Sequence, residues 1–155
     1  MLVENIMTRS TRACHPGDPL AHAAQLMWEN DCGAIPVCSN EGIPRVLGII
    51  TDRDICMHAL FHGKALQDLR VRDAMSHSLT LCRPADSLAQ AARLMRETRV
   101  RRLPVVRNDG TLVGMVCLAD LAREAEREQS LPRRELTPTD VGGTLAAISA
   151  PGHRL

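Results

Sequence analysis

A hydroxyl and a carboxylate stand three residues apart at Thr51 and Asp54, directly after a short apolar run. Residues 46–50 predict a buried strand, and the segment that follows predicts a helix capped by Thr51 or Asp52. The free N–H groups of a helix start favour an anion such as phosphate, and a nearby carboxylate accepts hydrogen bonds from both hydroxyls of a ribose. A helix that only needs a cap accounts for the same residues. Gly48, inside the strand, indicates a close backbone approach or a bulge.

The elements that must position this turn come earlier in the chain. Asp18 and Pro19 predict a helix start, with aspartate as the N-cap residue and proline at the first helical position. Apolar residues from Leu20 to Met27 then recur at helical spacing, which predicts one buried face. Residues 34–38 predict another short strand.

The same pattern returns 68 residues later, so the chain contains an internal repeat. Seventeen of the forty positions in residues 3–42 are identical to those in residues 71–110. After a shorter turn, the offset becomes 66 residues, which places Cys117 opposite Thr51 and Asp120 opposite Asp54. Each copy predicts strand–helix–strand–strand–helix. We expect the two copies to pack together, because one copy cannot bury both faces of its sheet.

This ordered set of repeated residues resembles the cystathionine-β-synthase (CBS) domain, and the pair resembles a stand-alone Bateman module. The resemblance covers about residues 1–125. It implies an α/β (α+β) fold of two βαββα repeats packed about a pseudo-two-fold axis. The residues that carry it are Met7 and Met75, the two Leu-x-x-Ala-Ala-x-x-Met helices, Gly33-Ala34-Ile35-Pro36-Val37 with Arg101-Arg102-Leu103-Pro104-Val105, and the two Gly-x-x-x-x-x-Asp segments.

The resemblance implies a regulatory, non-catalytic module that binds adenosine compounds in the clefts between its repeats. AMP, ADP, ATP and S-adenosylmethionine are the ligands expected for such a module, with NAD-type ligands in some members. Carried over from the family motif, Asp54 and Asp120 are ribose acceptors and Thr51 is a phosphate contact. Each of these residues has the simpler interpretation of a helix-start residue.

The second copy departs from the family motif, because Cys117 replaces the hydroxyl and is a poor donor. Some family members instead hold phosphate with basic residues just before the neighbouring strand, where this chain has Arg101 and Arg102. A guanidinium suits phosphate because it forms two parallel hydrogen bonds. We therefore expect unequal clefts. The arginines between residues 93 and 102 are also compatible with a solvated helix face.

The resemblance further implies a homodimer that assembles four CBS units into a disk, and an unknown protein that the module regulates. Trp28 aligns with Arg96, so we interpret it as a partly exposed residue or a dimer contact. We expect the first repeat with its linker at residues 1–67 and the second at 68–126. Residues 127–155 are expected to form a partly irregular tail, in which residues 144–149 are the candidates for a short helix or a subunit contact.

Composition excludes several classes of protein. The formal net charge of +1 provides no basic field for nucleic acid, and one Phe, one Trp and no Tyr cannot form an aromatic platform for single strands. No apolar stretch approaches the length of a membrane span, and the first residues lack the features of a signal peptide. We therefore expect a cytoplasmic protein without a membrane or nucleic-acid partner.

Three alternatives to a nucleotide sensor stay open. An enzyme needs a nucleophile with a base, a carboxylate pair or a metal set in one cleft, and the sequence predicts no catalytic and no metal-binding residues. The six cysteines form no Cys-x-x-Cys pair and are interpreted as free, mostly buried thiols, although a thiol- or metal-responsive sensor remains an alternative. The third alternative is a dimeric scaffold with empty clefts.

Overall fold

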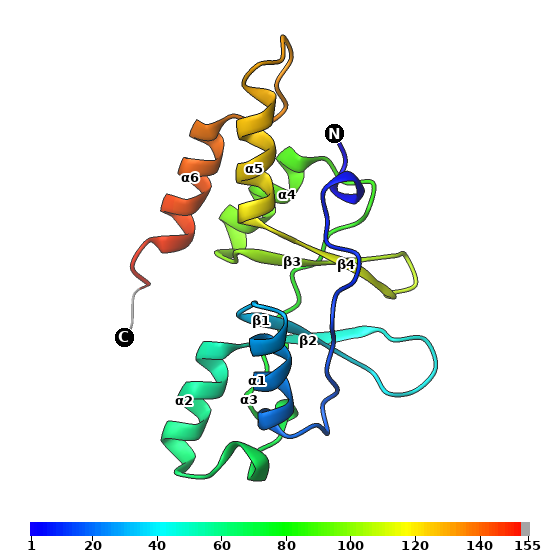
Figure 1. Cartoon of the computed structure of the whole chain (residues 1–155), viewed down its shortest axis with the longest axis vertical. Helices are drawn as coiled ribbons and strands as arrows, with labels where there is room; N and C mark the ends of the chain where they lie inside the picture. The colour runs from blue at the N-terminus through cyan, green and yellow to red at the C-terminus, as the bar shows by residue number, and fades with distance from the viewer. Residues whose placement is uncertain (153–155) are drawn as a thin grey trace. The chain divides into compact units, whose positions relative to one another are not determined.

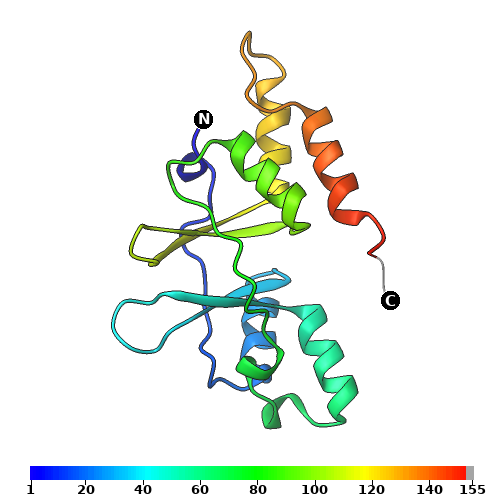
Figure 2. The same cartoon turned by 180° about the vertical axis from the view of Figure 1, so that it is seen from behind.

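A computed structural model describes residues 1–152, whose contacts divide them into two units. Unit 1 contains residues 1–9, 80–107 and the chain from residue 113 onward, and unit 2 contains residues 10–79 and 108–112. In each unit the main helices lie on one face of a small sheet (Figures 1 and 2). The predicted α/β fold with two β-α-β-β-α repeats is confirmed.

Unit 2 is built on the antiparallel pair of β1 (Ala34–Cys38) and β2 (Val46–Thr51), with Val37 opposite Gly48. Cys14 adds a parallel bridge to Val37 at the outer edge of β1. The apolar face of this sheet and the inner faces of the helices form one core. The helices of unit 2 are α1 (Leu20–Glu29), α2 (Asp52–His62) and α3 (Val71–Ala74), with a 3-10 turn, η2, at Leu66–Asp68.

Unit 1 repeats this plan and adds a helix. Its sheet pairs β3 (Arg102–Val106) with β4 (Leu112–Cys117), and Cys82 bridges Val105 in parallel as Cys14 bridges Val37. The helices of unit 1 are α4 (Leu88–Thr98), α5 (Leu118–Glu128) and α6 (Pro138–Ser149), with a 3-10 turn, η1, at Val3–Asn5. No helix within residues 1–152 is long and apolar enough to cross a bilayer.

Each sheet receives an edge segment from the other sequence copy. Ser76 exchanges two backbone hydrogen bonds with Ile49 of β2 (3.1 and 2.9 Å), and Thr8 exchanges two with Met115 of β4 (2.8 and 3.0 Å). A Cβ added to Gly48 would lie 2.3 Å from the Ser76 carbonyl oxygen, so the predicted close backbone approach is confirmed. The two contact-based units therefore interleave the two sequence copies, since residues 1–9 join unit 1 and residues 68–79 join unit 2.

The predicted cap of the first helix is wrong by one residue. Helix α1 begins at Leu20, and Pro19 occupies the N-cap position without a side-chain hydrogen bond. The Asp18 carboxylate instead accepts a hydrogen bond from the backbone N–H of His15 at 2.8 Å, which closes the turn before the helix. Aspartate suits both positions because its short side chain reaches nearby backbone N–H groups.

The tail contains a longer helix than the sequence predicted. Helix α6 begins at Pro138 rather than near Thr144, and Thr137 and Asp140 form a capping box at its start (3.2 and 2.9 Å). It packs against α4 and α5, and the Thr144 side chain is fully buried there. The adjacent Gly142 and Gly143 lower the intrinsic helix propensity of this segment, so its packing must stabilise it. The last three residues of the predicted tail lie outside the described residues.

Candidate functional site

The junction of β2 and α2 brings Thr51 and Asp54 together in unit 2. The Thr51 hydroxyl oxygen accepts a hydrogen bond from the Asp54 N–H (3.1 Å), and Asp54 Oδ2 accepts one from the Thr51 N–H (3.0 Å). The two residues therefore form a capping box and are held in fixed rotamers. Both are half-buried, and within residues 1–152 no donor reaches the second carboxylate oxygen of Asp54. That oxygen is available to a hydroxyl of a ligand.

The residue before β1 lies beside the start of α2, and the residue before β3 lies beside the start of α5. In unit 2, the Asp52 N–H donates to the Gly33 carbonyl (3.0 Å), and in unit 1 the Leu118 N–H donates to the Arg101 carbonyl (2.9 Å). The repeat thus places a glycine next to the start of α2 and an arginine next to the start of α5. The two helix starts are alike in their free N–H groups, which favour an anion, and differ in the residue beside them. That the two clefts are unequal stays a prediction.

The junction of unit 1 holds its carboxylate more tightly. Asp120 Oδ2 accepts hydrogen bonds from the Cys117 N–H (2.8 Å) and the Cys117 thiol (3.0 Å), and Oδ1 pairs with the Arg123 guanidinium. Burial, together with the Asp120 carboxylate, raises the pKa of the Cys117 thiol, which stays protonated and donates. Both oxygens of Asp120 are therefore occupied. Met57 stands at the position of Arg123 in the first copy, which leaves Asp54 without this ion pair.

A cavity of about 350 Å³ opens beside the start of α5. Its lining combines two arginines at and just before the start of β3 with apolar residues of α5 and α6. The lining residues are Arg101, Arg102, Cys117, Leu118, Ala119, Ala122, Val141 and Leu145. The structure thus brings the two predicted arginines together at one pocket. Asp120 is not among the residues that line it, and Thr51 and Asp54 belong to unit 2.

Sequence reasoning missed the part of this pocket that α6 supplies. Val141 and Leu145 come from a segment that has no counterpart in the first copy, so the repeat could not point to them. The available signal was the sequence Thr137-Pro138-x-Asp140, which is typical of a capped helix start.

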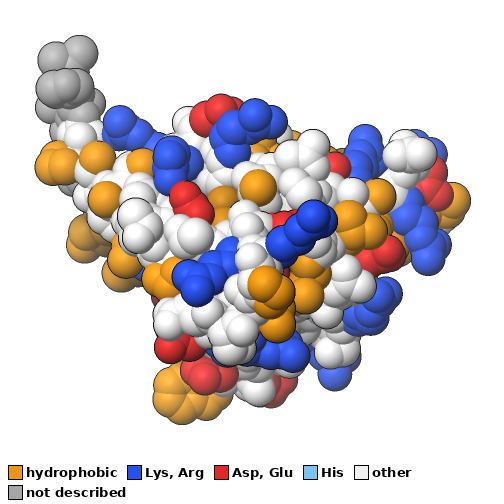
Figure 3. Space-filling view, turned by 90° about the horizontal axis from the view of Figure 1, so that it is seen from above, with side chains coloured by type: hydrophobic (Ala, Val, Ile, Leu, Met, Phe, Trp, Pro, Cys, Tyr) orange, Lys and Arg blue, Asp and Glu red, His pale blue; other side chains and the backbone are white. Residues whose placement is uncertain are grey.

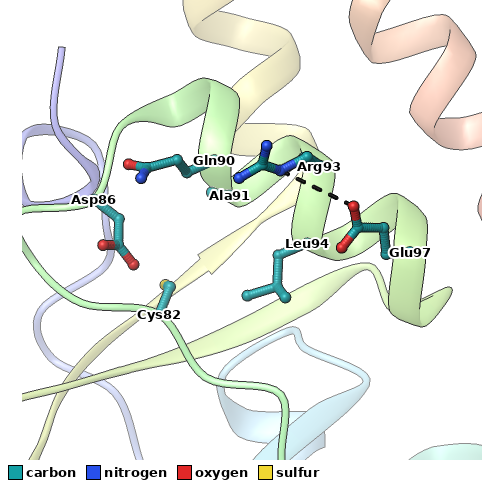
Figure 4. Close-up of a pocket in the computed structure, with 7 residues that line it drawn as sticks. All are labelled: Cys82, Asp86, Gln90, Ala91, Arg93, Leu94 and Glu97. Carbon is teal, nitrogen blue, oxygen red and sulfur yellow. Dashed lines mark ion pairs between the residues drawn. The ribbon is translucent and has the colours of Figure 1, made fainter.

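A second, smaller cavity of about 170 Å³ lies along α4 in unit 1 (Figure 4). The Arg93 and Glu97 side chains pair across one turn of the helix at 4.0 Å, and Cys82 lies on the preceding segment. Burial raises the pKa of the Cys82 thiol to about 12, so this thiol stays protonated at neutral pH. Its equivalent, Cys14, has a pKa of about 12 for the same reason, and each thiol lies 3.9 Å from a proline carbonyl. These matching contacts support the predicted packing role.

The remaining chemistry-bearing groups do not gather into a site in the part of the chain that the structure describes. No group of three His, Cys, Asp or Glu side chains within residues 1–152 can hold a metal ion. Cys14, Cys38 and Cys82 are buried and Cys56 is exposed, so the prediction of mostly buried thiols holds for half of the six cysteines. On the face drawn in Figure 3, basic side chains are interspersed with acidic and apolar ones.

Comparison of sequences relates the chain to known proteins. The family model of the CBS domain matches residues 3–60 and 71–127. The CBS domain-containing protein YhcV of Bacillus subtilis is 38% identical over 120 residues, which cover 77% of this chain and 82% of that protein. Hypoxic response protein 1 of Mycobacterium tuberculosis is 33% identical over 119 residues, which cover 77% of this chain and 81% of that protein.

Solved structures share the same fold. A crystal structure of CBSX2 in complex with AMP matches with a TM-score of 0.68 and 28% identity over 81% of this chain and 96% of that one. A crystal structure of Hypoxic Response Protein I with two coordinated zinc ions matches with a TM-score of 0.69 and 30% identity over 79% of this chain and 98% of that one. Helix α6 lies beyond both stretches that the family model matches.

Proposed function

Because this chain belongs to the CBS-domain family, as a pair of CBS domains over most of its length, we propose that it is a non-catalytic sensor of adenosine nucleotides. AMP is the first candidate because the related CBSX2 structure contains it, and ADP, ATP and S-adenosylmethionine belong to the same ligand class. The observation that carries the proposal is the duplicated strand-to-helix junction with a carboxylate held at its helix start. An unknown regulated protein receives the signal.

In unit 2 the proposed ligand binds mainly through its ribose. The second oxygen of Asp54 accepts from a ribose hydroxyl, while the Thr51 hydroxyl and the start of α2 lie next to the phosphate. The capping box keeps the carboxylate in place before the ligand arrives, so little side-chain entropy is lost on binding. Gly33 contributes no charge at this junction.

In unit 1 the proposed ligand binds mainly through its phosphate. Arg101 and Arg102 line the pocket and supply charge-assisted hydrogen bonds, whereas Cys117 cannot replace the hydroxyl of Thr51 as a strong donor. Asp120 accepts from a ribose only if the ligand displaces Arg123. Unit 1 therefore favours the more highly charged nucleotides, and unit 2 depends on the ribose.

Replacing Asp54 by asparagine is expected to weaken AMP binding to unit 2 about tenfold, because a hydrogen bond to a charged acceptor contributes ~1.5 kcal/mol or more. Asparagine retains an oxygen that accepts from the Thr51 N–H, so the cap of α2 is kept. Isothermal titration calorimetry measures the affinity in an Arg101→Ala/Arg102→Ala background, where unit 2 binds alone. Asp52→Asn is the matched control, since it removes the same charge from the same helix turn. Equal weakening by both substitutions would show a general charge effect instead of a ribose contact.

We also propose a homodimer that forms through α1 and α2 of unit 2. The only Trp and the only Phe of the chain lie on these two packed helices, with Trp28 88% exposed and Phe61 77% exposed. The equivalent positions in unit 1 are Arg96, whose guanidinium bonds to α6, and the charged Arg127. A second copy of the chain is proposed to bury these aromatic side chains, which are the residue types that dominate protein interfaces.

The variant Trp28→Arg/Phe61→Arg gives unit 2 the residues that unit 1 carries at these positions. We expect it to be monomeric at concentrations where the wild-type protein is dimeric, because four exposed aromatic side chains per dimer are replaced by like charges. Light scattering after size-exclusion chromatography measures the mass. Leu131→Arg, at an exposed position of unit 1, is the control and should stay dimeric. A monomeric wild-type protein, or a dimeric double variant, contradicts this interface.

A further inference from the structure

Helix α6 has no counterpart in the first copy and lies outside the residues that the family model matches. It nevertheless supplies Val141 and Leu145 to the pocket that holds Arg101 and Arg102. The pocket of unit 1 is therefore partly built by a segment outside the repeat, and unit 2 has no equivalent segment within residues 10–79.

Specific contacts hold α6 in place along its length. Arg96 of α4 donates to the Asp140 carbonyl (3.3 Å) and to the Thr144 hydroxyl (3.4 Å), and that buried hydroxyl donates to the same carbonyl (2.8 Å). A Cβ added to Gly143 would lie 3.0 Å from the Arg96 guanidinium, so glycine permits this approach. These contacts fix the face of α6 that turns toward the pocket.

The segment that leads into α6 is also anchored. The Glu128 carboxylate at the end of α5 accepts hydrogen bonds from the N–H groups of Glu135 (2.9 Å) and Leu136 (3.2 Å). Leu136 is buried in the core of unit 1, where Val141 and Ile148 of α6 also pack. The part of the pocket lining that α6 supplies therefore comes from a helix packed on the core of unit 1.

Two kinds of residue line the pocket. They are the basic residues Arg101 and Arg102, and aliphatic residues of α5 and α6, including Leu145. Its volume of about 350 Å³ lies in the range of small-molecule sites, about 300–1,000 Å³. A ligand complementary to this lining joins an anionic group to an apolar group, which aliphatic side chains contact because no aromatic residue is among those that line the pocket.

We infer that α6 is a specificity-determining wall of the unit 1 site, where Leu145 and Val141 contact the base of a nucleotide whose phosphate is held by Arg101 and Arg102. This inference rests on the proposed function and assigns its selectivity to α6. Because the ligand contacts α6 only in its docked position, binding also stabilises the docking of α6 by mass action. Occupancy of the pocket is thus linked to the position of the C-terminal helix.

The test compares AMP with ribose 5-phosphate, which lacks the base, in an Asp54→Asn background that weakens unit 2. Leu145→Ala is expected to lower the affinity for AMP about fivefold, through lost apolar contact, and to leave ribose 5-phosphate unchanged. Leu145 is 47% exposed, so its truncation should not unfold unit 1. Leu131→Ala is the matched control, because Leu131 is 49% exposed and does not line the pocket.

Hydrogen exchange of the α6 backbone provides a second readout, and AMP is expected to slow it in the wild-type protein. If AMP binds the wild-type protein and Leu145→Ala equally well, and the exchange of α6 does not change, the inference is wrong while the proposed function stands. If none of AMP, ADP, ATP and S-adenosylmethionine binds the wild-type protein, both are wrong. Equal weakening of AMP and ribose 5-phosphate by Leu145→Ala also overturns the role of α6 in base recognition.

Discussion

Replacing Gly48 by alanine is expected to lower the free energy of unfolding by about 3 kcal/mol or more, the upper range for overpacking a buried site. The new Cβ would lie 2.3 Å from the Ser76 carbonyl oxygen and 2.4 Å from the Met75 side chain. The methionine end can move, but the carbonyl is fixed by its pairing with Ile49. Relief of the overlap therefore breaks the backbone pairing that attaches residues 75–76 to β2.

Urea denaturation followed by circular dichroism measures this loss. Gly17→Ala is the matched control, because no atom lies within 4 Å of its added Cβ, and we expect it to change stability by less than about 0.5 kcal/mol. Gly114→Ala should behave like Gly48→Ala, since its Cβ would lie 2.7 Å from the Thr8 carbonyl oxygen. Equal stability of Gly48→Ala and Gly17→Ala would contradict the close approach of the two backbones.

The double substitution Arg101→Ala/Arg102→Ala is expected to weaken AMP binding to unit 1 by about a hundredfold or more. Each charge-assisted hydrogen bond to phosphate contributes ~1.5–3 kcal/mol, and the pocket has no other basic lining residue among those described. Arg101 is exposed and Arg102 is half-buried, so their removal should leave the fold intact. Calorimetric titration in the Asp54→Asn background, where the site of unit 2 is weakened, measures the effect on unit 1.

The control for this pair removes the same charge elsewhere on unit 1. Arg107 and Arg133 are exposed and do not line the pocket, so Arg107→Ala/Arg133→Ala should leave AMP affinity within about twofold, the small effect expected of distant screened charges. A similar loss in both double variants would attribute binding to the overall charge of unit 1. Unchanged binding after removal of Arg101 and Arg102 would place the phosphate elsewhere.

The capping residues of both junctions were predictable from the sequence. Thr51 and Asp54 have the spacing of a capping box, and the repeat extends it to Cys117 and Asp120. The glycine inside the strand pattern indicated a close approach or a bulge at Gly48. The capping boxes depend on neighbours within a few residues, which a local pattern encodes, whereas the partner of Gly48, Ser76, is distant in sequence.

Long-range features of the structure were not predictable in this way. The hydrophobic pattern of residues 1–9 does not indicate which sheet they join, and they pair with β4 of the second copy. Helix α6 has no copy to compare with, contains Gly142 and Gly143, and is held by contacts from Arg96 that are distant in sequence. The sequence also does not show that both oxygens of Asp120 are engaged, because this depends on the side-chain positions of Cys117 and Arg123.

Titration of the wild-type chain with AMP measures whether each unit binds a nucleotide. We predict saturable binding to two unequal sites per chain, of which one is weakened by Arg101→Ala/Arg102→Ala and the other by Asp54→Asn. The inequality follows from the two guanidinium groups in unit 1 and the open carboxylate oxygen in unit 2. Absence of saturable binding of AMP, ADP, ATP and S-adenosylmethionine at millimolar concentrations would contradict a nucleotide-sensing role and favour a dimeric scaffold.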